Sequence, residues 1–245
     1  MQSACTLIIC FAAIHAKSEA RQDELFASWQ EAQRTAMSLV VDFNLERRLG
    51  SFSDKAEGTF RLIRTPNGRI FASYRIYTGE ESFFIRDFSG LLNDGTVYIL
   101  NEKEKTASNL RSIQGDLMQF LEEYFNPFVL LLDKKYAKEK CYFELVKQDE
   151  WYTYLMVTPK DVKREGWFCD QFHKGRVVLM SKASEGVPKD MPREIRYIDG
   201  IRENIFAIKS WRFNAPDAPK EEEFTKPEDR PGWQVYDWAT GGMTK

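Results

Sequence analysis

The residue types that could do chemistry are few and scattered along the chain. Cys169 and His173 are four residues apart, so one helix face could hold both as metal ligands, but no second pair of ligands lies near them. The same two residues could form a nucleophile–base pair, yet no third residue that would orient the base can be named. The acidic run Glu221–Glu223 is expected to be solvated surface. The sequence has no Gly-x-Ser-x-Gly elbow, Walker loop or dinucleotide fingerprint. We therefore expect a protein that is not an enzyme and uses no cofactor and no metal.

The composition is that of a globular protein with a large core. The chain has 245 residues, of which 43% are hydrophobic and 14% aromatic, enough for one large domain. The net charge is −2 and no basic stripe stands out, which argues against binding to nucleic acid. We expect a monomer.

The N-terminus resembles a segment for export. Ala4 to Ala16 is almost continuously apolar, but it is shorter than the roughly 20 residues that cross a bilayer. It ends in Ser18-Glu19-Ala20, with small residues at the two positions that a signal peptidase reads. The sequence therefore predicts a signal peptide over residues 1–20, cleaved after Ala20, and a periplasmic protein. The alternative is a buried N-terminal helix, because no Lys or Arg precedes Lys17.

Two cysteines follow the predicted signal. Cys141 and Cys169 could form one disulfide in an oxidising periplasm. Two buried thiols are the alternative, because cysteine often packs as a small hydrophobe.

The stretch Asp54–Tyr77 is typical of a β-hairpin. Thr65-Pro66-Asn67-Gly68 has turn chemistry, because Pro presets φ and Asn-Gly tolerates positive φ. The flanking strands alternate between a small or apolar face and a face that carries charge, which favours a curved antiparallel sheet. The apolar face includes Phe60, Leu62, Ile70, Ala72 and Tyr74.

A meander of strands surrounds this hairpin. The pattern predicts a helix over Asp23–Ala36 and strands over Leu39–Leu45, Ser82–Phe88, Thr96–Leu100, Thr106–Leu110, Cys141–Lys147, Trp151–Thr158, Gly175–Ser181, Arg193–Ile198 and Ile205–Phe213. From Asn214 the chain becomes Pro-rich and acidic. The fold class is mainly β with α (α+β).

Residues 114–132 interrupt the meander with the strongest apolar helical pattern in the chain. Asn126-Pro127 predicts two helices that meet at an angle. Such helices must be buried, and their natural place is over the open face of the sheet. They either fill an ordinary core or cover a cavity that holds an acyl chain. The residues expected to contribute are Leu117, Phe120, Leu121, Phe125 and Phe128.

Several motifs resemble the LolA-like superfamily of periplasmic outer-membrane lipoprotein carriers. The residues of Glu57–Pro66 are similar to the family's Gly-x-(apolar)-x-(apolar)-x-(Arg/Lys)-Pro strand and corner. Phe143–Lys147 followed by Trp151–Leu155, and Phe224–Pro227 followed by Pro231–Trp233, resemble a less-studied bacterial branch of it.

The resemblance implies one domain over residues 21–238, followed by a flexible tail over 239–245. It implies a strongly curved antiparallel sheet, an incomplete β-barrel, covered by a helical lid, with acyl chains of a lipoprotein or another amphiphile held between them. Membrane-bound donor and acceptor proteins would be partners.

Arg64 matches the arginine that latches the lid in the carriers, although Thr65 intervenes before Pro66. The alternative for Arg64 is a surface arginine at a turn. The alternative for the whole protein is an envelope interaction or sensor module that uses the same fold without lipid. An exposed aromatic patch around Trp167–Phe168 would favour that alternative.

Overall fold

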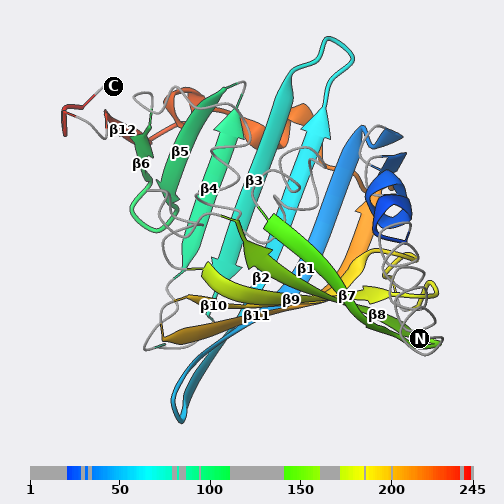
Figure 1. The fold of residues 1–245 in the computed structure, drawn as a ribbon. Helices are drawn as coiled ribbons and strands as arrows, with labels where there is room; N and C mark the ends of the chain where they lie inside the picture. Colours follow the sequence, from blue (N-terminus) through cyan, green and yellow to red (C-terminus); the bar gives the residue numbers. More distant parts are fainter. Residues whose placement is uncertain are drawn as a thin grey trace, which may run out of the picture.

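The computed structural model is mostly β (Figure 1). It describes residues 21–28, 31–32, 35–78, 82, 87–93, 95–110, 141–160, 172–184, 186–199, 201–237 and 240–243. The predicted signal, the predicted lid helices, Cys169 and the Trp167–Phe168 stretch lie outside these residues. The helical lid is therefore an expectation that the described residues do not test. No helix among the described residues is long and apolar enough to cross a membrane.

In the described part of the chain, twelve strands form a single curved sheet that does not close into a barrel. In space they follow the order β12-β6-β5-β4-β3-β2-β1-β11-β10-β9-β8-β7. The strands are β1 (Ser38–Leu49), β2 (Phe52–Arg64), β3 (Ile70–Tyr77), β4 (Phe88–Asn93), β5 (Thr96–Asn101), β6 (Thr106–Asn109), β7 (Cys141–Gln148), β8 (Tyr152–Pro159), β9 (Phe172–Met180), β10 (Pro192–Asp199), β11 (Arg202–Phe213) and β12 (Gln234–Asp237). The neighbours pair antiparallel, except that β12 runs parallel to β6.

The central hairpin has the predicted form. Leu62 pairs with Ala72, and Phe60 pairs with Tyr74 across β2 and β3. The connecting turn is closed by the Gly68 N–H, which donates to Thr65 O at 2.9 Å. Gly68 has a φ of 83°, a left-handed conformation that a side chain would disfavour. The turn chemistry read from the sequence is thus confirmed.

One predicted strand differs from the structure at its described positions. The sequence places a strand at Ser82–Phe88, but β4 begins at Phe88, and neither Ser82 nor Asp87 is in a strand. The Asp87 carboxylate accepts hydrogen bonds from the N–H and hydroxyl of Thr78, at 2.8 and 3.0 Å. This cap satisfies the backbone at the end of β3, so ladder pairing with β4 starts only at Phe88, opposite Ile76.

The two halves of the sheet meet where β1 pairs with β11. A register shift between Asp42 and Phe43 marks a β-bulge on this seam, which bends the strands. On the outer face the Asp42 carboxylate accepts bonds from Thr59 Oγ1 at 3.1 Å, Ser210 Oγ at 3.0 Å and Arg212 Nη1 at 2.7 Å. These three bonds tie β2, β1 and β11 together at the bend.

The described helix, residues 21–28 with 31, 32 and 35, extends the inner core. Leu25 and Phe26 are buried in the same apolar cluster as the inner face of the sheet. Phe26 contacts Phe143 of β7 edge to face, with ring centroids 5.1 Å apart. Arg21 Nη2 lies 2.8 Å from Asp190 Oδ1 in the turn before β10. The helix therefore links to the C-terminal half of the sheet.

The outer face carries a second core, which the sequence did not predict. We expected the face of β3 that includes Phe71 to carry charge, but Phe71 is 1% exposed and packs against Phe224, with centroids 6.0 Å apart. The C-terminal segment covers this part of the sheet with η1 (Glu221–Phe224), η2 (Pro227–Asp229) and β12. The cluster comprises Ile63, Phe71, Leu91, Tyr98, Leu100, Ala107, Phe224 and Val235. In Figure 1 this orange-to-red segment passes behind β4 and β5.

Candidate functional site

The inner face of the sheet is buried and mainly apolar. The ladder register aligns its side chains in three rows that cross β4, β3, β2, β1 and β11. The rows are Leu92–Ala72–Leu62–Leu39–Phe213, Gly90–Tyr74–Phe60–Val41–Trp211 and Phe88–Ile76–Gly58–Phe43–Ile208. Alternation along each strand places all of them on one face. The apolar surface thus continues across the seam between the two halves.

The five sheet residues predicted to line a cavity all lie on this face. Phe60, Leu62, Ala72 and Tyr74 are buried, and Ile70 is half-buried and packs against the same cluster. The five helical residues predicted to face them lie outside the described residues. The structure therefore places the five sheet residues of the predicted site on one face. The part of the site that the helices were expected to form stays a prediction.

Within the three rows the polar atoms are neutral. Burial raises the pKa of the Tyr74 phenol far above its ordinary value of 10, so the hydroxyl keeps its proton. The indole Nε1 of Trp211 donates to the Pro192 carbonyl oxygen at 2.9 Å, which satisfies its buried N–H. An apolar chain on this face would meet no charged group in these rows.

Polar residues bound the set of rows on both sides, in the direction of the strands. At one end Arg47 is opposite Asp54 on β2 and Asn204 on β11, and Arg47 Nε donates to Asn204 Oδ1 at 2.8 Å. Asn204 is 1% exposed and Asp54 8%. At the other end Arg64 is opposite Ile70 and is half-buried. The structure therefore places Arg64 at the rim of the inner face; the helices it was predicted to latch are outside the described residues.

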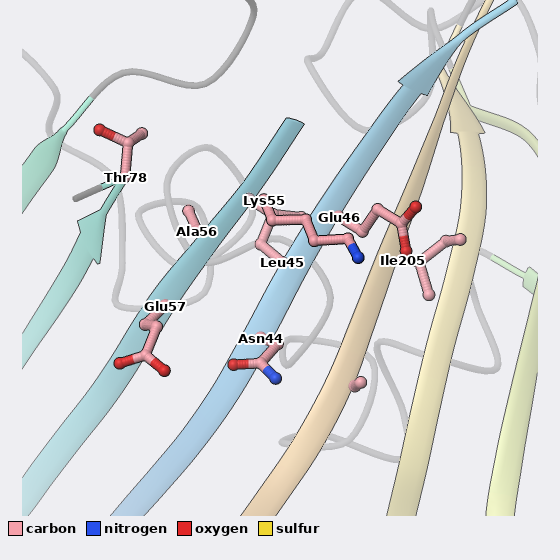
Figure 2. Close-up of a pocket in the computed structure, with 9 residues that line it drawn as sticks. Asn44, Leu45, Glu46, Lys55, Ala56, Glu57, Thr78 and Ile205 are labelled. Carbon is pink, nitrogen blue, oxygen red and sulfur yellow. The ribbon is translucent and has the colours of Figure 1, made fainter. Parts of the chain in front are cut away.

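A hollow of roughly 380 Å³ on the sheet contains residue types suited to acid–base chemistry. Figure 2 shows Lys55 of β2 extending across β1 toward Glu46, with Glu57 farther along β2. The hydrogen bond from Arg48 is the main cause that lowers the pKa of Glu46, so this carboxyl is a poor proton donor near neutral pH. Glu57 lies 2.7 Å from Lys209 Nζ. This geometry gives no acid–base pair.

The other candidates for chemistry find no support among the described residues. No three His, Cys, Asp or Glu side chains there are placed to hold a metal ion. Cys141 is buried at 2% exposure on β7, and Cys169 is outside the described part of the chain, so their pairing stays open. Glu221 and Glu223 are exposed, as expected, but pair with Arg69 and Arg61 at 2.9 and 2.7 Å. These ion pairs are part of the docking of the C-terminal segment.

Comparison of the sequence with known proteins does not show which family the chain belongs to. No family model matches the chain. A curated relative is 28% identical over 93 residues, the subunit 5 of biogenesis of lysosome-related organelles complex 1 from Nematostella vectensis. The match covers 37% of this chain and spans 55% of the length of that protein.

Comparison with solved structures finds partial similarities at low sequence identity. One is MucB, with a TM-score of 0.46 and 13% identity, where the match covers 84% of this chain and 63% of MucB. Another is the LolA superfamily protein NE2245 from Nitrosomonas europaea, with a TM-score of 0.38 and 11% identity, covering 82% of this chain and 98% of that one.

Proposed function

We propose that the chain is a non-catalytic carrier or chaperone that holds the acyl chains of a lipoprotein, or a related amphiphile, against the inner face of its sheet. The single observation that carries the proposal is the run of three uncharged apolar rows across five strands, bounded on both sides, in the direction of the strands, by polar residues. An acyl chain would lie parallel to the strands and cross the rows, and the polar end of the amphiphile would lie at Arg64 or at Arg47.

Burial of apolar surface would drive such binding. Each methylene removed from water contributes about 0.8 kcal/mol, so a long acyl chain needs no metal or covalent bond to be held. Because Phe60 and Tyr74 are already buried, the ligand reaches them only in a form of the protein in which the face is uncovered. Binding favours that form only if the ligand binds it better than the covered form.

The predicted export signal supports a location in the bacterial envelope, where amphiphiles move between two membranes. We propose that the mature protein begins after Ala20 and works in the periplasm, with membrane-bound proteins as donor and acceptor. N-terminal sequencing of the protein purified from its own cells tests this: an N-terminus at residue 21 is expected, and retention of residues 1–20 would contradict it.

The binding test uses a dansyl-labelled fatty acid and native mass spectrometry of the protein purified from its own periplasm. We expect saturable uptake of the probe and a co-purifying lipid or lipoprotein. Ile70→Glu places a charge on the half-buried rim of the inner face and should weaken uptake roughly tenfold or more, because a charge near an acyl chain loses water contacts.

Val146→Glu is the matched control, because Val146 is 56% exposed and lies on β7, at the edge of the sheet. It should leave uptake unchanged. Absence of lipid in native spectra together with no uptake of the probe would reject the carrier function. A co-purifying protein in place of lipid would then favour the envelope interaction or sensor module.

A further inference from the structure

A second hollow, of roughly 230 Å³, lies on the outer face between the strands and the C-terminal segment. Three arginines line it: Arg61 on β2, Arg75 on β3 and Arg230 after η2. The ladder register places Arg61 opposite Ser73, and Arg75 opposite Ser89. The two pairings set guanidinium and hydroxyl groups side by side on the floor of the hollow.

Among the described residues, positive charge exceeds negative charge around this hollow. Glu223 is the carboxylate in its lining, and its Oε2 lies 2.7 Å from Arg61 Nη1. Glu102 contacts both of the other arginines, at 3.4 Å from Arg75 and 3.9 Å from Arg230. Three guanidinium groups therefore face two carboxylates, and one carboxylate is shared at longer distances.

Arg230 is held in place but incompletely neutralised. Its side chain is 18% exposed, its Nε donates to the Thr225 carbonyl oxygen at 2.9 Å, and its guanidinium lies 4.9 Å above the Trp233 ring. Burial lowers the pKa of this arginine below its ordinary value. A guanidinium fixed in a half-buried position is stabilised by an additional anion.

Ser89 provides an independent indication of a ligand. The residue is 8% exposed, lines the hollow, and its Oγ is buried without a hydrogen-bond partner among the described residues. A buried hydroxyl that makes no hydrogen bond costs free energy, and native proteins avoid it unless a water or ligand completes the site. Its position opposite Arg75 places this donor beside a cation.

We propose that this outer hollow binds a phosphate group, carried by a small soluble molecule or by a lipid headgroup. The paired N–H donors of an arginine guanidinium match the oxygens of phosphate, and a serine hydroxyl supplies one more donor. The volume equals that of roughly eight waters at about 30 Å³ each, which is ample for one phosphate group. The site is on the opposite face of β3 from Tyr74, so it does not depend on the acyl-binding proposal.

The first experiment compares sodium phosphate with sodium chloride at equal ionic strength, by calorimetric titration and thermal unfolding of the full chain. Phosphate should bind and raise Tm, whereas chloride should not. Arg75→Gln should weaken phosphate binding about tenfold, because it removes charge-assisted hydrogen bonds. Ser89→Ala should weaken it less and tests the site without removing charge.

Arg176→Gln is the matched control. The Arg176 side chain is 40% exposed, close to the 41% of Arg75, but it lies on β9 and pairs with Glu194 at 2.7 Å. It should keep phosphate affinity within about twofold. Equal responses to phosphate and chloride, or an equal loss in Arg75→Gln and Arg176→Gln, would overturn the proposal.

Vesicle sedimentation then distinguishes the two sources of phosphate. Phosphatidylcholine vesicles with and without phosphatidic acid are mixed with the wild type and with Arg75→Gln. Sedimentation that requires phosphatidic acid and is lost in Arg75→Gln supports a lipid headgroup. Binding of inorganic phosphate without such sedimentation supports a soluble phosphate compound.

Discussion

Phe43 lies directly over Gly58 on the inner face of the sheet. The two residues are opposite each other on β1 and β2, and a Cβ on Gly58 would lie 2.1 Å from Phe43 Cζ. The Phe43 ring also stacks on Tyr74, with centroids 5.7 Å apart, and contacts Phe206 at 5.4 Å. The missing side chain at Gly58 thus lets one ring join β3 and β11 across the seam.

Gly58→Ala should destabilise the protein by about 1–3 kcal/mol, because the added methyl overpacks the core against Phe43. Urea unfolding measures the change. Phe43→Leu in the Gly58→Ala background should recover part of the loss, which gives a favourable coupling energy in a double-mutant cycle. Strictly additive costs would contradict the contact as its cause.

Phe224→Ala should release the C-terminal segment from the outer face. Phe224 is 1% exposed, and its carbonyl oxygen accepts a bond from Asn93 Nδ2 at 2.6 Å. Truncating a buried aromatic side chain costs about 3–5 kcal/mol, so exchange protection of the β12 amides should fall. The control Glu222→Ala changes an exposed side chain of the same turn. Unchanged protection of β12 in Phe224→Ala would show that other contacts hold the segment.

The hydrogen bonds of the Asp149 carboxylate, in the β7–β8 turn, predict that the stability of the protein depends on pH. Its carboxylate accepts bonds from the N–H groups of Tyr152 at 2.8 Å and Trp151 at 3.0 Å, and the Tyr152 bond is the main cause that lowers its pKa below the ordinary 3.8. A lowered native pKa stabilises the folded state above pH 3.8, and this stabilisation is lost as the pH falls through the native value.

Asp149→Ala should therefore lower Tm at neutral pH, with a difference from wild type that shrinks below pH 3.8. Glu150→Ala, which removes the neighbouring exposed carboxylate, is the control. A difference between Asp149→Ala and wild type that stays constant from pH 7 to below 3.8 would contradict the assignment.

Arg64→Gln tests the latch role that the family resemblance implies, and it rests on the proposed acyl binding. The substitution keeps the backbone bond from Arg64 N to Met37 O, which is 2.8 Å long. If the guanidinium holds the cover closed, release of a bound fluorescent fatty acid should become about tenfold faster, the effect expected for one charge-assisted hydrogen bond. Arg69→Gln, at the other end of the same turn, should not change release. Equal rates in Arg64→Gln and wild type would make Arg64 a surface arginine.

Local patterns predicted most of the sheet correctly. The hairpin, its turn and the apolar alternation of β2 and β3 follow from residues close together in sequence. Strand ends were less predictable, because Asp87 caps β3 through Thr78, and composition does not reveal such a bond in advance. The second core was missed because an acidic, Pro-rich segment is typical of exposed chain, and only its contact with Phe71 shows otherwise.

The sequence by itself determined a mainly β protein with one apolar sheet face, because side-chain alternation and turn chemistry act over a few residues. Only the tertiary structure decided which strands are neighbours. The pairing of β1 with β11 joins the two halves and aligns the apolar rows, and the parallel pairing of β12 with β6 draws the C-terminal segment over the outer face. These pairings join residues more than 100 positions apart, and their stability comes from burial and register that no local pattern contains.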